Sequence, residues 1–247
     1  MKLLTTRQTK LDKSQAHGLD TLTVGLQLSP EREAAAVLSR TDLPSVCSFS
    51  GACAALCLRD AGLNKLPTHS VVRATRTALY FDDPDTFFAQ LFRELKSAET
   101  KAYRLGYTFA IRPNVLSDLP KLAHRIAKQF PGASCYDYTK IPRPHLRQLD
   151  NYRLAYSYSE RSTKRDIAEC IEHGVNIAVV FDAVKGSPLP KHCTLAGATL
   201  PVIDGDVSDL IYTYPTGVII GLRFKGSRRR MQDGIDAGWI KQTQQTH

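Results

Sequence analysis

Short apolar runs alternate with amphipathic segments along the C-terminal half of the chain, and each run has the length of a strand. Strands are rich in β-branched and aromatic residues and are bounded by turn residues. Runs of this kind lie at residues 107–112, 134–138, 153–157, 175–181 and 200–203. We expect each of them to form a strand.

Two segments between these runs carry the 3.6-residue period of a helix. Residues 119–130 have apolar side chains at positions 119, 122, 123, 126, 127 and 130, and residues 162–173 repeat the pattern. Ser117 or Asp118 is suited to cap the first helix, and Gly174 to end the second. Strands that alternate with helices in this way are typical of βα units and a parallel sheet.

The N-terminal part predicts one strand, a loop rich in Pro, Ser and Gly, and two helices. These lie at 21–28, around the cysteines, at 71–80 and at 84–105, and a last strand is predicted at 217–224. The fold class we expect is α/β, with a partial or complete parallel (βα) barrel that is TIM-barrel-like. A single domain would span 1–247: residues 1–106 with the N-terminal strand, cysteine loop and helices, 107–224 with the βα units, and 225–247 as a basic C-terminal segment.

The composition is that of an ordinary globular protein, since 43% of the 247 residues are hydrophobic and 23% are charged. No run approaches the roughly 18 apolar residues that span a bilayer, and residues 1–10 lack the apolar core of a signal peptide. We therefore expect a cytoplasmic protein without membrane contact. The net charge of +9 is consistent with a nucleotide or nucleic acid as partner, although many basic proteins bind neither.

Polar side chains follow the end of most predicted strands. They are Arg112, Asn114, Ser117 and Asp118 for the first strand, Asp137 and Lys140 for the second, Ser157, Ser159 and Glu160 for the third, and Asp204 and Asp206 for the last of the five. Because the carboxyl ends of parallel strands meet at one edge, we expect these groups to share one crevice. Asp137, Lys140 and Glu160 are the candidates for catalysis, and the others for binding substrate or cofactor. The alternative is that such residues cap helices and form turns.

Asp137 lies between Tyr136 and Tyr138, inside a predicted strand. Side chains alternate along a strand, so tyrosines packed outward against helices would leave Asp137 pointing into a barrel. A buried carboxylate needs a partner, and we expect Arg112, Lys140 or a bound cation. Asp204 and Asp206 point the same way in extended chain, which suits either metal or hydroxyl binding or a solvated turn.

Three of the six cysteines form a cluster with the spacing C-x5-C-x3-C, at Cys47, Cys53 and Cys57. On a helix, Cys53 and Cys57 would lie one above the other, and Cys47 could fold back toward them. Three thiolates so placed suit an iron–sulfur cluster with one open iron, or zinc with a fourth ligand such as His69. The alternative is that these cysteines pack as small apolar side chains in an Ala-rich helix.

Basic residues provide a further candidate surface. They are Arg73, Arg76, Arg143, Arg147, Arg223, Lys225 and Arg228 to Arg230. They could bind phosphate groups, or they could form solvated helix faces. The chain has no Walker A sequence, dinucleotide-binding GxGxxG, GxSxG elbow or HExxH motif, so these reaction classes are not leading candidates.

Taken together, the motifs resemble the phage protein family called Gene product 88. The resemblance covers nearly the whole chain and rests on the cysteine region through Cys57-Leu58, Arg112-x-Asn114-x-x-Ser117-Asp118, Tyr136-Asp137-Tyr138-Thr139-Lys140, Asn151-Tyr152, Ser157-Tyr158-Ser159-Glu160, residues 176–181, Val202-Ile203-Asp204-Gly205-Asp206 and residues 217–226. It implies a protein that works in the cytoplasm of an infected bacterial cell. The family itself implies no particular activity.

The cysteine motif followed by βα units is also similar in architecture to radical S-adenosylmethionine (SAM) enzymes. In that superfamily a partial barrel holds a [4Fe–4S] cluster on three cysteines, usually spaced C-x3-C-x2-C, and SAM binds the fourth iron. The leading hypothesis is therefore a phage-encoded, metal- or iron–sulfur-dependent barrel enzyme that acts on a nucleotide or nucleic-acid base. One alternative is a zinc-containing base-exchange barrel with Asp137 as nucleophile. The other is a non-catalytic basic protein that binds nucleic acid or a host protein.

Overall fold

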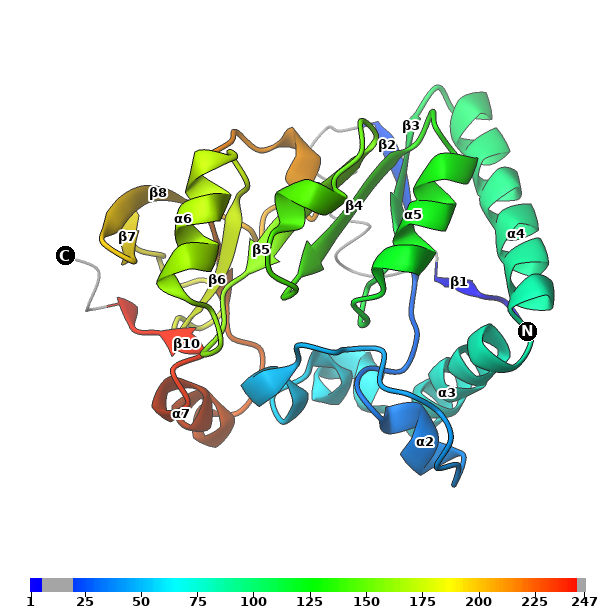
Figure 1. The fold of residues 1–247 in the computed structure, drawn as a ribbon, viewed down its shortest axis with the longest axis horizontal. Coiled ribbons are helices and arrows are strands. Elements are labelled where there is room, and N and C mark those ends of the chain that lie inside the picture. Colours follow the sequence, from blue (N-terminus) through cyan, green and yellow to red (C-terminus); the bar gives the residue numbers. More distant parts are fainter. Residues whose placement is uncertain (6–19, 244–247) are drawn as a thin grey trace.

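One mostly parallel sheet organises the chain (Figure 1). The computed structural model describes residues 1–5 and 20–243, so the end of the basic C-terminal segment, 244–247, lies outside the described residues. The strands are β1 (Leu4–Thr5), β2 (Thr21–Leu26), β3 (Thr108–Arg112), β4 (Ser134–Thr139), β5 (Tyr152–Ser157), β6 (Ile177–Phe181), β7 (His192–Leu195), β8 (Ala198–Asp204), β9 (Ile219–Arg223) and β10 (Ile240–Lys241). The α-helices are α2 (Glu33–Val37), α3 (Pro67–Asp82), α4 (Pro84–Arg104), α5 (Pro120–Gln129), α6 (Lys164–Glu172) and α7 (Arg228–Asp236).

The sheet has the strand order β1-β2-β3-β4-β5-β6-β9-β8-β7, and β10 pairs with β6. Strands β2, β3, β4, β5, β6, β9 and β8 are parallel to their neighbours, whereas β1 and β7 are antiparallel at the two edges. The expectation of an α/β fold with a parallel sheet is confirmed. A complete barrel is wrong, because in the described part of the chain β1 and the β7–β8 hairpin occupy the edges that would have to pair for closure.

Strand β6 pairs with two different strands along one of its sides. Its first two residues pair with the end of β5, and its last two, Val180 and Phe181, pair with β10. Strand β9 pairs along the whole other side of β6, so β5 and β10 share one side. The sheet therefore parts between β5 and β6 at its carboxyl end.

The helices predicted from periodicity are present. Helix α5 buries Leu122, Ala123 and Ile126 against the sheet, as its apolar face predicts. Neither predicted cap is used there, because the helix begins at Pro120 with Leu119 as the N-cap and no capping side chain. Helix α6 begins at a capping box of Thr163 and Asp166, which satisfies the first amides of the helix.

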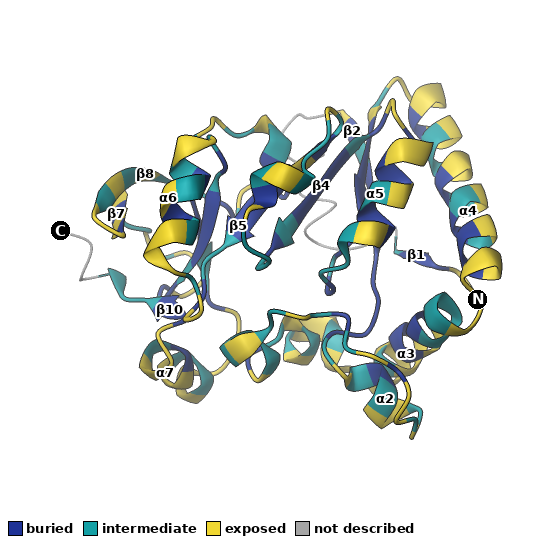
Figure 2. Ribbon diagram, viewed as in Figure 1, coloured by how far each residue is buried: buried dark blue, intermediate teal, exposed yellow. Residues whose placement is uncertain are grey.

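The two faces of the sheet carry different side chains. Helices α4, α5 and α6 cover one face, where large apolar residues of the strands are buried (Figure 2). The opposite face, here called the inner face, carries Ala110, Tyr136, Ala155, Ala178 and Ile220. Alanine on β3, β5 and β6 leaves space above the sheet, so this face can border a cavity.

The outer surfaces of the helices are exposed, and their buried residues point at the sheet (Figure 2). None of the described helices is long and apolar enough to cross a membrane.

Candidate functional site

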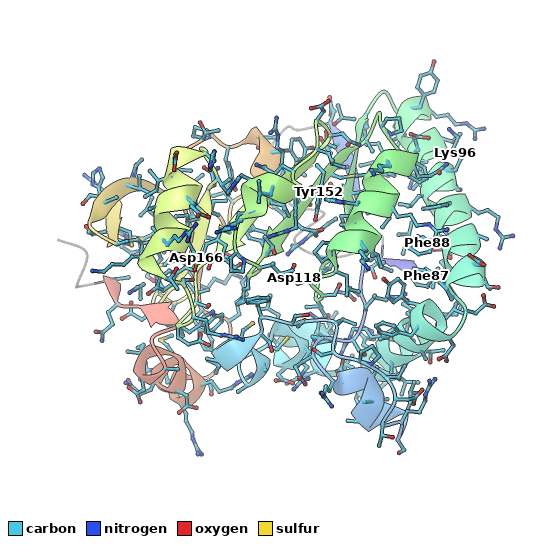
Figure 3. The ribbon with its side chains drawn as sticks, in the orientation of Figure 1. Phe87, Phe88, Lys96, Asp118, Tyr152 and Asp166 are labelled. Atoms are coloured by element: carbon cyan, nitrogen blue, oxygen red, sulfur yellow. The ribbon has the colours of Figure 1, made fainter. Side chains whose placement is uncertain are left out.

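A cavity of about 200 Å³ lies at the carboxyl ends of the strands. Its walls come from the cysteine loop, defined here as residues 47–57, from the β3 loop, residues 113–118, and from the ends of β3, β4, β5, β6 and β9. The predicted site residues that line it are Cys47, Cys53, Cys57, Arg112, Asn114, Ser117, Asp118, Lys140 and Ser157. Asp118, labelled in Figure 3, lies between the carboxyl end of β4 and the residue before the cysteine loop, Val46. The structure thus brings predicted residues from four distant parts of the sequence to one site.

The predicted loop around the cysteines is present, but its cysteines do not lie on the α-helix that would place Cys53 and Cys57 one above the other. A short 3₁₀ helix, η1 (Gly51–Ala54), ends before Cys57, which has the extended dihedrals φ −59° and ψ 145°. The left-handed φ of +51° at Gly51 sets where the turn begins. Cys53 and Cys57 therefore do not lie on one helical face, although both line the cavity.

Two contacts join the cysteine loop to the β3 loop. The Asp118 amide donates to the Val46 carbonyl at 2.9 Å. The Cys47 thiol lies 3.5 Å from the Leu116 carbonyl oxygen and donates to it. The first thiol is therefore placed by the loop that follows β3.

Glu160, a predicted catalytic residue, holds the cysteine loop from outside. Its Oε1 accepts from the Ala52 amide at 2.8 Å, and it does not line the cavity. A Cβ atom at Gly51 would lie 2.0 Å from the same oxygen, so any other residue there would displace the Glu160 carboxylate from the Ala52 amide. On the other side, Arg230 in α7 donates to the Ala55 carbonyl at 2.7 Å. Glu160 is thus a positioning residue in this geometry.

Burial favours the protonated form of two thiols in the cavity wall, Cys47 and Cys57. It raises the pKa of Cys47 to about 12 and that of Cys57 to about 11, and the neighbouring cysteines raise both further. Among the residues that the structure describes, no group of three or more His, Cys, Asp or Glu could hold a single metal ion. His69, the candidate fourth ligand, is exposed in α3 and does not line the cavity.

Asp137 organises the β3 loop from beneath. Its Oδ1 accepts from the Asn114 amide at 2.8 Å, and its Oδ2 accepts from Asn114 Nδ2 at 3.0 Å and from the Tyr152 hydroxyl at 2.9 Å. Asn114 in turn accepts from Ser117 Oγ at 2.7 Å and from the Leu119 amide at 3.0 Å. Burial raises the pKa of Asp137 to about 7, although Arg112 and these hydrogen bonds oppose the rise.

Asp137 and its two tyrosine neighbours point to opposite faces of the sheet, as predicted, but each lies on the face that we expected for the other. Tyr136 and Tyr138 belong to the inner face, and Tyr138 lines the cavity. Asp137 points to the helix face, is 1% exposed and does not line the cavity. Neither Arg112 nor Lys140 is hydrogen-bonded to it in the described structure. This carboxylate acts on the site through Asn114.

Arg112 forms a buried ion pair that the sequence did not reveal. Its Nη1 lies 3.0 and 2.7 Å from the two carboxylate oxygens of Asp209, and both side chains are nearly inaccessible. The Tyr136 hydroxyl also donates to Asp209 at 3.2 Å. Asp209 follows the acidic pair of β8 by a few residues, but only the fold shows its partner, 97 positions away.

Asp118 is a carboxylate in the wall of the cavity. It accepts from Thr139 Oγ1 at 2.9 Å and from the Lys140 amide at 2.9 Å. Burial raises its pKa, so a cationic ligand group beside it would be stabilised. The Lys140 ammonium itself lies over the ring of Trp239, which the sequence analysis did not single out.

Asp204 and Asp206 do converge, but on a cation of the protein. Arg223 Nη1 lies 2.8 Å from Asp204 and 3.3 Å from Asp206, and Lys225 Nζ lies 3.2 Å from Asp206. The two cations line the cavity, whereas the two aspartates do not. Ser159 also lies behind the wall, where its hydroxyl accepts from the Arg161 amide at 3.3 Å.

Several predicted phosphate-binding cations are structural instead. Arg73 is buried against Glu33 at 2.7 Å, and Arg76 donates to the Lys2 carbonyl at 2.9 Å. Arg147 donates to two carbonyls of the loop after β4. These arginines hold the backbone and are not a free basic surface.

The fold and the cavity together define an α/β protein with an open parallel sheet and a thiol-lined site at the carboxyl ends of its strands. The family model described as Gene product 88 matches residues 2–240. The chain therefore belongs to the Gene product 88 family, the phage family that its motifs resemble. No curated protein and no solved structure matches the chain significantly.

Proposed function

We propose that this protein is an iron–sulfur enzyme of the radical SAM type that acts on a nucleotide or a nucleic-acid base. One observation carries the proposal: three cysteines of the loop that follows the first parallel strand line one cavity at the carboxyl ends of the strands. The strand ends add polar groups of both signs to the same cavity. A site of this composition can bind a charged cofactor beside a substrate.

The strand order supports the partial-barrel form of this proposal. Strands β2, β3, β4, β5, β6 and β9 are neighbours in this order, all parallel, and α4, α5 and α6 cover one face of them. We propose that these six strands are the partial barrel, with its mouth at the cavity. The edge strands β1, β7 and β8 would then be additions to it.

The donor set is of the kind that an iron–sulfur cluster uses. A four-iron cluster binds each cysteine through a different iron atom, so it needs a wall lined by three thiols rather than three thiols that converge on one ion. Cys47, Cys53 and Cys57 provide such a wall and would hold the cluster. When bound, the cluster would supply the electron that cleaves SAM.

The residues of the chain would bind and orient the ligands. Asp118, whose buried carboxylate favours a cationic neighbour, would hold the ammonium group of SAM, with the β3 loop fixed beneath it by Asp137. Lys140 and Arg223 would hold carboxylate or phosphate groups. Leu56, Leu58 and Phe224 give the cavity apolar walls.

The zinc-containing alternative is less well supported. It needs Asp137 as a nucleophile, and that carboxylate is buried on the helix face behind Asn114. We retain zinc only as an outcome of the metal analysis.

Anaerobic purification with iron and sulfide analysis tests the proposal. We expect a brown protein with about four irons and four sulfides per chain after reconstitution. Replacing Cys47, Cys53 and Cys57 together by Ser should abolish iron binding. Cys193→Ala, a buried cysteine in β7 outside the cavity, is the matched control and should bind iron as the wild type does.

Two results would contradict the proposal. One is a colourless wild-type protein that takes up no iron, and the other is equal iron in the triple variant. Zinc in place of iron, lost in the triple variant, would favour a structural zinc site.

A further inference from the structure

Three aromatic rings in the wall of the cavity each carry a cation. The pairs are Phe49 with Arg161 at 5.3 Å, Tyr158 with Lys241 at 4.7 Å, and Trp239 with Lys140 at 6.0 Å from cation to ring centroid. The rings come from the cysteine loop, the end of β5 and the segment before β10. We call these three pairs the aromatic rim.

The cations of the rim differ from the cations deeper in the site. In the part of the chain that the structure describes, Lys140, Arg161 and Lys241 form no ion pair. Arg112 and Arg223, by contrast, are each paired with aspartate. The rim therefore offers positive charge that no carboxylate of the described residues contacts at ion-pair distance.

A flat ring beside an uncompensated cation matches the chemistry of a nucleotide. Bases stack on aromatic side chains, and the neighbouring phosphates pair with Lys or Arg. Cations over rings also stack on bases, so the two parts of each pair reinforce each other. A polyanion without bases would use only the cations.

We propose that the aromatic rim binds a single-stranded nucleic acid, with one base admitted to the cavity beside Trp239 and the flanking bases stacked on Phe49 and Tyr158. The inference rests on the proposed function, because it takes the cavity as the substrate site, and it deepens that function by naming the substrate class. Three ring-and-cation pairs exceed what one nucleotide can occupy. A base still stacked in a duplex could not enter an enclosed site, which favours a single strand.

Fluorescence anisotropy with labelled oligonucleotides about 12 nucleotides long tests the inference on the full-length protein. The probes are single-stranded DNA, single-stranded RNA of the same sequence, and the corresponding duplex. We expect either single strand to bind at least tenfold more tightly than the duplex, and the preference between DNA and RNA to identify the natural strand. A mononucleotide and inorganic polyphosphate serve as competitors and should compete at least tenfold more weakly than the unlabelled strand.

Two variants separate stacking from charge. The pair Phe49→Leu and Tyr158→Leu removes the rings but keeps apolar volume, and it should weaken strand binding about tenfold. The pair Arg161→Gln and Lys241→Gln should weaken it similarly and lower the slope of log Kd against log salt by about two, one per cation. Tyr103→Leu and Lys101→Gln, both exposed in α4, are the matched controls and should bind like the wild type.

The inference is overturned if the wild type binds no strand, if the duplex binds equally well, or if either competitor matches the strand. It is also overturned if both rim variants bind like the controls. Arg161 is exposed, so its replacement leaves the fold intact and the charge test readable.

Binding needs no iron, so the assay is repeated on the Cys47, Cys53 and Cys57 triple Ser variant. We expect this variant to bind the strand as the wild type does. A wild-type protein that binds the strand but takes up no iron would refute the proposed chemistry alone, and one that takes up iron but binds no strand would refute this inference alone.

Discussion

The two loops that border the cavity are stabilised in different ways. The β3 loop stands on a buried hydrogen-bond network, in which Asp137 and Asn114 satisfy each other and the surrounding amides. The cysteine loop consists of short 3₁₀ turns, and η1 has no buried residue. Side-chain contacts from Glu160 and Arg230, near the surface, hold it in place.

The two loops therefore differ in rigidity as walls of the cavity: the β3 loop is the polar wall, and the cysteine loop is the thiol wall. A buried, fully paired network is costly to break, whereas exposed contacts contribute little each. The polar wall is therefore preorganised before any ligand binds. The thiol wall, which weaker contacts hold, is the less rigid of the two. Four variants, ordered by the size of the expected effect, test this comparison.

The largest effect should come from the buried pair at the base of the β3 loop. Arg112→Met leaves Asp209, 2% exposed, without its cation, and we expect a loss of about 3–5 kcal/mol in the free energy of unfolding. Urea denaturation followed by the fluorescence of the single tryptophan, Trp239, measures it. The double variant Arg112→Met with Asp209→Asn should recover part of the loss. An unchanged midpoint in the single variant would show that the pair does not support this wall.

The next effect concerns Asp137. Asp137→Ala removes the acceptor of the Asn114 and Tyr152 hydrogen bonds, and at pH 5 we expect a loss of about 2–4 kcal/mol. Asp150→Ala, an exposed aspartate in a turn, should change the stability by less than about 0.5 kcal/mol. Equal stability of the two variants would contradict the positioning role.

The same variant carries a pH signature. The pKa of Asp137 is raised to about 7 in the folded protein, from about 3.9 in an unfolded chain. The folded state therefore binds more protons between these values, and the stability that this carboxyl contributes falls as the pH rises from about 4 to 7. The gap between wild type and Asp137→Ala should narrow over this range. If the stability difference between wild type and Asp137→Ala grew instead as the pH rose, the pKa of Asp137 would not be raised in the folded protein.

A smaller effect is expected on the cysteine loop. Glu160→Ala frees the Ala52 amide, and we expect a loss of about 1 kcal/mol or less in global stability. The local effect should be clear, as faster hydrogen exchange of the amides in residues 51–55. Glu172→Ala, an exposed glutamate at the end of α6, should leave this exchange unchanged. If both variants exchange alike, Glu160 does not hold the loop.

The smallest effect should come from the cysteines themselves in the metal-free protein. Among the described residues the three thiols donate one hydrogen bond, the weak one from Cys47 to Leu116, and Cys53 is only partly buried where it packs against the apolar side chains near Trp239. Replacing Cys47, Cys53 and Cys57 together by Ser should change the free energy of unfolding by no more than about 0.5 kcal/mol. A loss above roughly 2 kcal/mol would mean that the thiols are packing residues, and that the two walls are equally rigid.

The sequence by itself determined the elements and the region of the site. The 3.6-residue period of residues 119–130 and the β-branched run of 175–181 fixed a helix and a strand, because side-chain spacing and backbone geometry are local properties. The parallel arrangement followed from their alternation. Since parallel strands end at one edge, Arg112, Asp118 and Ser157 could be expected at one site.

The tertiary structure alone decided which face and which partner each residue has. Both faces of a parallel sheet are covered, so alternation could not tell whether Asp137 or its tyrosine neighbours face the cavity. Glu160 meets Ala52 across 108 positions, and Arg112 meets Asp209 across 97. Contacts of this range depend on how the whole chain packs, and no local pattern encodes them. The same holds for the rim, where Phe49, Tyr158 and Trp239 meet only because three distant segments end at one cavity.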